Sequence, residues 1–311
     1  MALYLVTGGC GFIGSHLADA LVAAGHGVRI LDDLSTGKRE NAPHAAEIVV
    51  GDVADAAAVR RAMAGVAGCF HLAAIASVAR SNEDWAGTHR VNLTGAINVF
   101  DAARAQAGGP VPVVYVSSAA VYGDNPNVPL AEDAATRPLT AYGADKLGCE
   151  LHARVAHTVH RVPVVGFRFF NIYGPRQDPR SPYSGVISIF TDRILAGRPV
   201  EIHGDGEQTR DFVYVADAVR FLMRGMAGPF DGSRVFNVCT GRATSVNALA
   251  RIIAEAAGRR VELRHAAPRP GDIRVSIGDP RAATAALGIG VETAIEDGLR
   301  TTVASIAAAG G

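Results

Sequence analysis

The chain has 311 residues, of which 49% are hydrophobic and 19% charged, so it is long enough to bury the core of one large or two modest domains. Its 30 basic residues balance its 30 acidic residues, and a neutral chain has no basic field with which to recruit nucleic acid or an anionic membrane. No apolar run approaches the roughly 18 residues that a membrane span needs.

Six short runs in the first half of the chain are apolar and rich in strand-forming residues, and we interpret them as strands. Each is almost continuously hydrophobic, which is expected when helices cover both faces of a parallel sheet. The strands are expected at residues 3–7, 28–31, 47–50, 69–72, 113–117 and 163–169, and the helices between them at about 13–24, 55–65, 94–106 and 143–160. This alternation predicts an α/β fold with right-handed crossovers and a Rossmann-like doubly wound parallel sheet.

The pattern changes after residue 170. Residues 171–185 contain several prolines and glycines and predict a long loop, and beyond it helices dominate. The helices are expected near 186–197, 216–227, 246–256 and 291–307, with short strands near 200–203 and 235–238. We therefore expect a first domain over residues 1–170, to which later segments can return, and a smaller, mostly C-terminal α/β lobe over residues 171–311.

The first predicted strand leads into a glycine-rich turn with the sequence TGGCGFIG. Gly8, Gly11 and Gly14 give it the spacing GxxGxxG. Glycine permits a tight turn and the close approach of a phosphate, and the following helix offers free N–H groups and the positive end of its dipole. A strand before the turn and a helix after it favour a pyrophosphate-binding loop over a βαβ unit with only a structural role.

An acidic residue ends the second predicted strand. Asp32 lies 18 residues beyond Gly14, where a carboxylate accepts hydrogen bonds from a ribose and repels a 2′-phosphate. Position 33 is a second aspartate. The two acids favour NAD over NADP, and the nearby Lys38 and Arg39 leave NADP open.

Only two of the 30 basic residues are lysines, and one of them, Lys146, stands four residues after Tyr142. At this spacing the two side chains lie on the same face of a helix. A phenol titrates well above neutral pH, so it needs a neighbouring cation to act as a base near pH 7. Ser118 follows the fifth predicted strand, at the edge where open α/β sheets bind ligands. We expect Ser118, Tyr142 and Lys146 to form a catalytic group that removes a proton from a hydroxyl.

Taken together, these residues resemble the extended short-chain dehydrogenase/reductase family. Within it, the chain is most similar to the nucleotide-sugar 4-epimerases, the group that includes the UDP-glucose (UDP-galactose) 4-epimerases. The resemblance covers nearly the whole chain, and the motifs occur in the family's order. They lie at residues 7–14, 52–53, 71–74, 92–95, 118–123, 142–146, 168–177, 209–212 and 269–272.

The resemblance implies NAD as the cofactor and assigns its site to the first domain. Phe12 and Ile13 would contact the pyrophosphate, and Asp32 the adenosine ribose. Tyr142 and Lys146 would lie at the nicotinamide ribose. The remaining cofactor residues would be Asp52 and Val53 beside the adenine, and Leu72, Ala73 and Ala74 along the nicotinamide.

The resemblance also places a UDP-sugar in the C-terminal lobe. Asn171, Arg210 and Arg269 would hold the diphosphate, and Asp272 the uridine ribose. A neutral protein needs placed guanidinium groups to bind two phosphates, and the arginine fork matches phosphate oxygens. A local surface ion pair with Asp211 is the alternative interpretation of Arg210.

By similarity, the expected function is that of an NAD-dependent epimerase that inverts C4 of UDP-glucose or UDP-galactose through a transient 4-keto sugar. Tyr142 would take the proton of the 4-hydroxyl with Ser118 hydrogen-bonded between them, so both would also touch the substrate. The keto sugar turns about its diphosphate, which requires a firmly held nucleotide and loose sugar contacts. The cofactor is regenerated in every cycle and is expected to stay bound.

Three positions bear on the alternatives. Dehydratases of the family carry an acidic pair beside the catalytic hydroxyl, where this chain has Ala119 and Ala120, and this disfavours elimination. Ala120 also replaces a threonine that touches the sugar in some epimerases. Ser276 stands where some members carry a bulky tyrosine, so UDP-N-acetylglucosamine is a hypothetical further substrate. UDP-glucuronate is another alternative, and a non-catalytic NAD-binding sensor or scaffold is the alternative of another class.

A homodimer is expected, with the helices at 94–106 and 143–160 paired across a two-fold axis as in relatives, although both helices can equally be buried within one subunit.

Four scattered cysteines without CxxC spacing favour reduced thiols, and the N-terminus lacks the features of a signal peptide. These features predict a cytoplasmic protein. The ten histidines contain no HExxH pattern, and no metal is expected.

Overall fold

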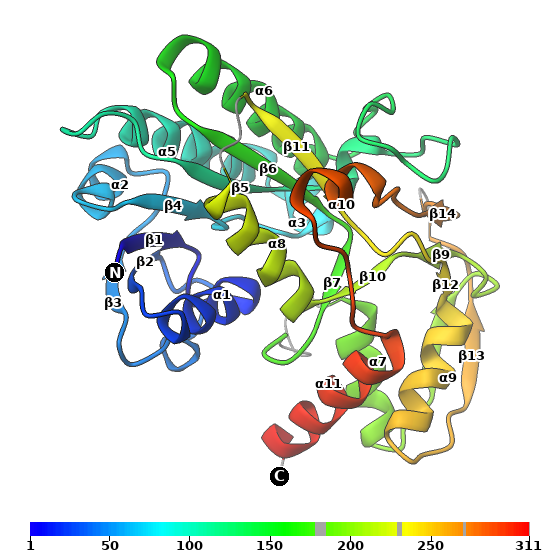
Figure 1. Ribbon diagram of the computed structural model, residues 1–311. Coiled ribbons are helices and arrows are strands. Elements are labelled where there is room, and N and C mark those ends of the chain that lie inside the picture. Colours follow the sequence, from blue (N-terminus) through cyan, green and yellow to red (C-terminus); the bar gives the residue numbers. More distant parts are fainter. Residues whose placement is uncertain (178–184, 229–231, 270–271, 311) are drawn as a thin grey trace.

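The computed structural model describes residues 1–177, 185–228, 232–269 and 272–310. Its largest element is a seven-stranded sheet with the order β11-β6-β5-β4-β1-β2-β3, in which every neighbouring pair is parallel (Figure 1). The strands are β1 (Leu3–Thr7), β2 (Gly27–Asp32), β3 (Glu47–Val50), β4 (Gly68–His71), β5 (Val113–Ser118), β6 (Val164–Phe169) and β11 (Arg234–Val238). The predicted doubly wound parallel sheet is confirmed.

Helices cover both faces of this sheet because successive strand residues point to opposite sides. Val6 packs into the core on one face, and its neighbour Leu5 packs into the core on the other. The helices on the first face are α1 (Phe12–Ala23), α8 (Val215–Ala227) and α10 (Arg281–Leu287), and those on the second are α2 (Ala56–Met63), α5 (Gly95–Arg104) and α6 (Ala141–His160). Burial on both sides explains why the strands are almost continuously hydrophobic.

The strand order reverses beside β1. The chain runs from β1 to β2 and β3 on one side and then crosses to β4, β5 and β6 on the other. Ligands of open α/β sheets bind at the carboxyl ends of the strands around such a reversal. The glycine turn after β1, the segment after β4 and the end of β5 therefore meet along one edge.

The rest of the chain forms a smaller lobe, seen at the lower right of Figure 1. Its core contains Phe190, Leu249 and Ile253 from its helices. The helices are α7 (Val186–Leu195), α9 (Val246–Ala256) and α11 (Ile295–Gly310). The strands are β7 (Asn171–Tyr173) paired with β10 (Phe212–Tyr214), β8 (Val200–His203) paired with β13 (Leu263–Ala266), and β9 (Thr209–Arg210) between β12 (Thr244–Ser245) and β14 (Val275–Ser276).

The prediction of a loop over residues 171–185 is wrong at its start, where three residues form β7; residues 178–184 lie outside the described residues. The short helices α3 (Val78–Glu83), α4 (Trp85–His89) and α10 and most of the small lobe's strands have no predicted counterpart. Such elements are too short to show a hydrophobic period. Segments after residue 170 also lie on the large sheet, namely β11, α8 and α10. The division at residue 170 remains a prediction.

Among the described residues, no helix has both the length and the apolar character required to cross a membrane.

Candidate functional site

The glycine turn after β1 leaves no room for side chains. Gly8 has φ +71°, and a Cβ there would lie 2.8 Å from the backbone nitrogen of Ala73. A Cβ on Gly14 would lie 2.1 Å from the carbonyl oxygen of Gly8. Helix α1 begins at Phe12 and has no side-chain cap at Gly11, so no cap occupies the N–H groups of its first turn. A helix start of this kind is complementary to a pyrophosphate, and the loop fits the pyrophosphate of a dinucleotide.

Asp32 ties the end of β2 to this loop. Its carboxylate accepts the N–H of Cys10 and the N–H of Leu34, both at 2.9 Å. The residue is only 6% exposed, and burial raises the pKa of its carboxyl while the two backbone hydrogen bonds lower it. A carboxylate has about four lone-pair sites, so acceptor capacity remains for ribose hydroxyls.

Thr7 organises the segment after β4. Its hydroxyl oxygen accepts the N–H groups of Leu72 and Ala73 at 3.2 Å and lies 2.8 Å from Nδ1 of His71. Since the oxygen accepts from both amides, its proton points to His71, whose Nδ1 then accepts. Burial lowers the pKa of His71 to about 3, and the charge of Lys146 adds to the effect. His71 is therefore neutral. Its hydrogen bond with Thr7 helps to fix the segment that contains the predicted nicotinamide residues Leu72, Ala73 and Ala74.

Asp52 and Val53 follow β3, next to the strand that ends at Asp32. Asp52 accepts the N–H of Ala54 and pairs with Arg90, both at 2.8 Å. Val53 is buried, and a Cβ on Gly95 would lie 2.7 Å from its Cγ2. The structure thus places both residues on the Asp32 side of the edge, where the resemblance puts the adenine.

Tyr142 lies in the first turn of α6. The hydroxyl of Thr140 caps this turn by accepting the N–H of Gly143 at 3.0 Å, and the N–H of Tyr142 donates to Oγ of Ser81 at 3.2 Å. Ser118 ends β5, and its Oγ accepts the N–H of Ala120 at 3.2 Å. A Cβ on Gly143 would lie 2.7 Å from the carbonyl oxygen of Ala120, so the start of α6 touches the turn that follows Ser118.

Lys146 joins these two elements. Its Nζ lies 5.8 Å from the centre of the Tyr142 ring and donates to the carbonyl oxygen of Val116 at 2.8 Å. Val116 is two residues before Ser118 on β5, and Lys146 is 5% exposed. The structure therefore brings the buried ammonium to the phenol and to the strand that carries Ser118.

The predicted diphosphate residues lie on three segments of the small lobe. Asn171 begins β7, and both its backbone and its side-chain N–H groups donate to the carbonyl oxygen of Asp211 at 3.0 Å. Arg210 pairs with Asp272 at 2.5 Å and donates to the carbonyl oxygen of Ile273 at 2.6 Å. Arg269 is exposed, and its carbonyl oxygen accepts the N–H of Asp272 at 3.3 Å.

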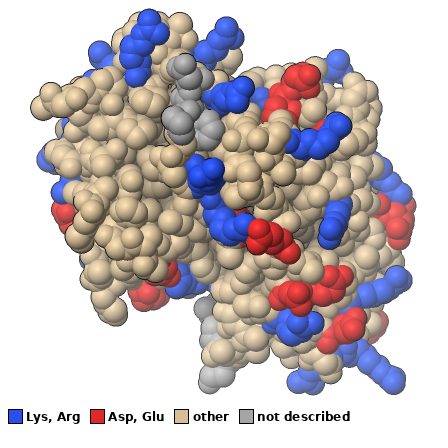
Figure 2. All heavy atoms as spheres, in the orientation of Figure 1, with Lys and Arg blue, Asp and Glu red and all other residues tan. Residues whose placement is uncertain are grey.

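The alternative of a surface pair between Arg210 and Asp211 is wrong. Asp211 is fully buried and accepts hydrogen bonds from Thr240 and from the N–H of Gly241. Burial raises the pKa of its carboxyl. The arginine thus turns toward Asp272, its partner among the predicted substrate residues. On the face shown in Figure 2, acidic and basic side chains are interspersed.

A hollow of about 460 Å³ lies beside Asp272. One wall is formed by residues 124–126, Val128 and Leu139, which follow the Ser118 turn, and the other by residues 272–275. The N–H of Leu130 donates to the carbonyl oxygen of Ile277 at 2.8 Å and fastens the two walls. The segment that follows the Ser118 turn and the predicted uridine residue therefore line one pocket.

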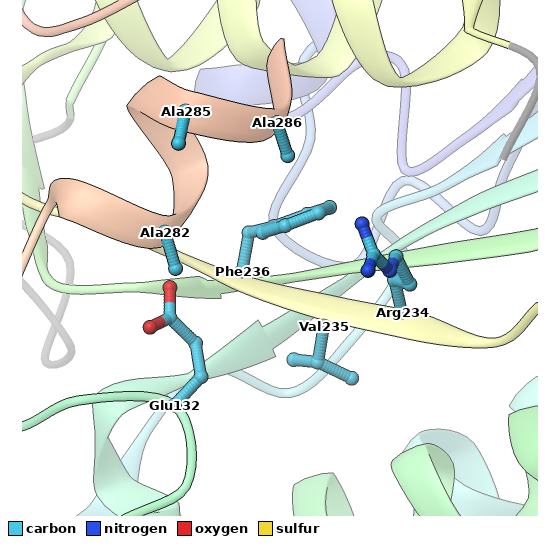
Figure 3. Close-up of a pocket in the computed structure, with 7 residues that line it drawn as sticks. All are labelled: Glu132, Arg234, Val235, Phe236, Ala282, Ala285 and Ala286. Atoms are coloured by element: carbon cyan, nitrogen blue, oxygen red, sulfur yellow. The ribbon is translucent and has the colours of Figure 1, made fainter.

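A second hollow of about 460 Å³ lies between β11 and α10 (Figure 3). Glu132 and Arg234 stand on either side of Phe236, with three alanines of α10 above. Glu132 already accepts the N–H of Asn237 at 2.8 Å, and the guanidinium of Arg234 lies 6.0 Å from the Phe236 ring centre. No predicted site residue lines this second hollow. The candidate functional site is therefore the sheet edge.

The chain matches the NAD dependent epimerase/dehydratase family over residues 4–239. It is 40% identical to a UDP-glucose 4-epimerase of Mycolicibacterium smegmatis over 96% of each chain. The structure of a UDP-glucose 4-epimerase from Thermotoga maritima with UDP-glucose has a TM-score of 0.95 at 36% identity, over 99% of this chain and 100% of the other. A UDP-N-acetylglucosamine 4-epimerase from Methanobrevibacter ruminantium has a TM-score of 0.93 at 34% identity, over 99% of both chains.

The fold and the edge residues define an enzyme that uses a dinucleotide at the carboxyl edge of a doubly wound sheet. The chain belongs to the NAD-dependent epimerase/dehydratase family of extended short-chain dehydrogenases/reductases. It is an epimerase-type enzyme with NAD as its cofactor.

Proposed function

We propose that the protein inverts C4 of a UDP-hexose and interconverts UDP-glucose and UDP-galactose. The contact of Lys146 with both the Tyr142 ring and the strand of Ser118 carries the proposal, because the proposed proton transfer needs a cation beside the phenol and a hydroxyl nearby. Two alanines, Ala119 and Ala120, stand where a dehydratase has its acidic pair, which favours epimerisation.

In this proposal Tyr142 is the base, and Ser118 passes the proton of the 4-hydroxyl to it or holds that hydroxyl in place. The ammonium of Lys146 stabilises the phenolate and holds the ribose hydroxyls of the cofactor. NAD supplies, when bound, the acceptor and donor of the hydride at C4. Neutral His71 adds no charge beneath the predicted nicotinamide residues.

The small lobe, residues 171–311, is proposed to hold the nucleotide. Arg210 and Arg269 would grip the diphosphate with Asn171, and Asp272 the uridine ribose. Arg210 pairs with Asp272, so the guanidinium proposed for the diphosphate lies beside the carboxylate proposed for the ribose. A guanidinium has five N–H donors, so Arg210 can donate to phosphate oxygens as well as to Asp272, and such charge-assisted hydrogen bonds are strong.

The test is to incubate the purified protein with UDP-glucose, UDP-galactose, UDP-N-acetylglucosamine and UDP-glucuronate without added NAD, and to follow the C4 configuration by NMR. The proposal expects interconversion of the first two. Tyr142→Phe should lower kcat by about 10²- to 10⁴-fold, since it removes the proton acceptor. Tyr4→Phe, a change of the same kind at a ring packed between His26 and Phe70, should leave kcat unchanged.

The scaffold alternative predicts a different result. A non-catalytic NAD-binding protein would invert none of the four sugars, and Tyr142→Phe would leave its function intact. No inversion by the wild-type protein, with NAD bound and the fold intact, would therefore refute the proposed activity.

UDP-N-acetylglucosamine is a second candidate substrate because of Ser276. This small residue lies opposite Arg210 in the pairing of β14 with β9, close to the predicted diphosphate site. The similarity to the UDP-N-acetylglucosamine 4-epimerase agrees with a roomier sugar pocket. Ser276→Tyr should lower kcat/KM for the N-acetylated sugar more than for UDP-galactose, and no turnover of the N-acetylated sugar by the wild type would refute this extension.

A homodimer through α6 is also proposed. Leu151, Val155 and Val159 recur every four residues along this helix and are 59%, 49% and 64% exposed. Such a stripe is suited to pair with its copy.

A cytoplasmic location is proposed because the four cysteines are all buried and free.

A further inference from the structure

A buried ion pair lies directly behind the catalytic edge. Arg168 of β6 and Glu150 of α6 form two parallel hydrogen bonds, Nε to Oε1 at 2.8 Å and Nη2 to Oε2 at 2.7 Å. Their side chains are only 7% and 8% exposed. Neither residue has a part in the proton transfer or in the predicted binding sites described above.

Glu150 also reaches the strand that carries Ser118. Its Oε1 accepts the hydroxyl of Ser117 at 2.6 Å, and Ser117 immediately precedes Ser118. Glu150 stands one helical turn after Lys146, which donates to Val116 on the same strand. Helix α6 is therefore fastened to the last residues of β5 at two points, one turn apart.

Arg168 is itself fixed from other elements. Its Nη1 donates to the hydroxyl of Tyr122 at 2.8 Å and to the carbonyl oxygen of Glu132 at 2.9 Å, and its guanidinium lies 4.8 Å from the Tyr122 ring centre. The Tyr122 hydroxyl donates to Asn237 of β11 at 2.7 Å. The carboxylate of Glu150 is thus held by a cation that cannot move without breaking contacts to three segments.

We propose that Glu150, held by Arg168, is a positioning residue that sets the register of α6 on β5. This inference rests on the proposed function, because Tyr142 and Lys146 are carried by the helix and Ser118 by the strand. A misplacement of about 1 Å between reacting groups can lower a rate by about 10²-fold. A contribution to stability does not by itself explain this ion pair, since well-packed apolar residues commonly replace a buried ion pair without loss of stability.

Ser117→Ala tests the direct link, because it removes the hydroxyl and leaves the ion pair intact. The proposal expects kcat to fall by about 10- to 100-fold, while KM for the UDP-hexose and the amount of bound NAD stay within about twofold of wild type. Thr302→Val is the matched control, since the Thr302 hydroxyl on α11 is equally buried and donates to the carbonyl oxygen of Gly298 at 2.7 Å. It should leave kcat unchanged.

The ion pair requires a second variant, because Glu150→Gln alone leaves a buried arginine without its partner and is expected to destabilise the fold. Glu150→Met/Arg168→Met removes both charges together and also removes the acceptor of the Ser117 hydroxyl. Its midpoint of urea unfolding should recover toward that of wild type, while kcat stays at least about tenfold lower. A stable double variant with wild-type kcat, or Ser117→Ala with wild-type kcat, would show that the network is merely structural.

A crystal structure of the double variant keeps this test independent of the substrate. The proposal expects the 2.8 Å contact of Lys146 Nζ with the Val116 carbonyl oxygen to lengthen beyond hydrogen-bond distance. An unchanged contact would overturn the positioning role even if the protein inverts UDP-hexoses. Inactive wild-type protein would overturn only the proposed function.

Discussion

A single buried side chain, His71, gives the protein a defined response to acid. Burial lowers its pKa to about 3, with the charge of Lys146 as a second cause. An unfolded histidine titrates near 6.5, so between these two values the unfolded chain binds a proton that the folded chain does not. The contribution of His71 to the free energy of unfolding therefore falls as the pH falls below about 6.5.

His71→Asn should weaken this response, since an amide oxygen can accept the Thr7 hydroxyl and does not titrate. Between pH 6.5 and pH 5 the wild type should lose about 2 kcal/mol of unfolding free energy more than the variant loses. Urea unfolding monitored at the two pH values measures the difference. His44→Asn, at an exposed histidine, should keep the wild-type response, and equal slopes for wild type and His71→Asn would contradict the assignment.

At the residue scale, the sequence predicts groups that a spacing or a composition singles out. Lys146 stands out as one of two lysines, and its helical spacing from Tyr142 predicts the contact that the structure has. Thr7 and Glu150 do not stand out, because their partners lie 64 and 33 residues away in sequence. Arg210 illustrates the same limit, since its partner is Asp272 and not the adjacent Asp211.

At the scale of elements, the turn between β1 and α1 depends on Gly14. A Cβ there would lie 2.1 Å from the carbonyl oxygen of Gly8, and a backbone atom cannot yield without moving the turn. Gly14→Ala should therefore displace the N–H groups that we propose face the pyrophosphate and lower stability by about 1–3 kcal/mol. The protein should purify without NAD, which the ratio of absorbance at the nucleotide and protein maxima reports.

Gly108→Ala is the control for this change, since nothing lies within 4 Å of a Cβ at that glycine. It should keep both the cofactor and the stability. Full NAD content in Gly14→Ala would show that the turn adapts, and the pyrophosphate assignment of this loop would lose its main support.

The cap of α6 allows a second prediction at this scale. Thr140 accepts the N–H of Gly143, one residue after Tyr142, and Ser245 caps α9 in the same way through Ala248. Removing either hydroxyl by an alanine substitution should cost about 1 kcal/mol of stability. Only Thr140→Ala should also lower kcat, because only that turn carries the proposed base. Equal kcat in the two variants would show that the capped turn does not position the phenol.

Element prediction from the sequence is accurate where a hydrophobic run spans four residues or more and is flanked by turns. The six strands of the first half and the long helices meet this condition. Strands β7, β9, β12 and β14 have two or three residues each and form through pairing with distant segments, so no local pattern reveals them. The pairing of β11 with β6 in the large sheet is likewise set by the fold, and the hydrophobic residues of β11 do not reveal it.

At the scale of the whole molecule, the segment that follows Ser118 and the segment that follows Asp272 are tied together. The segment after Ser118 bonds through Leu130 to Ile277, a few residues beyond Asp272. The chain just beyond Asp272 is thereby joined to the segment that follows the proposed catalytic turn. This connection is consistent with a substrate whose nucleotide is bound by one lobe and whose sugar reacts at the other.

The proposed dimer is the prediction that belongs to the molecule as a whole. Helix α6 is two-sided: Cys149, Ala153 and Ala156 pack into the sheet core, while Leu151, Val155 and Val159 are exposed. The sequence left two alternatives for this helix, pairing across a two-fold axis and burial within one subunit. Both are compatible with the structure, because one face is buried within the subunit and the other is exposed. Apolar side chains repeated along one exposed face are typical of an interface.

Val155→Glu places a charge in the middle of this stripe. Two such charges would face each other across a two-fold axis and lose their hydration, so the variant should sediment as a monomer at concentrations where the wild type is a dimer. Because Val155 is already half exposed, the fold of each subunit should survive, as circular dichroism would show. Ile189→Glu, at an exposed residue of α7, should leave the dimer intact. A wild-type protein that sediments as a monomer at every concentration would rule out the stripe as a dimer interface.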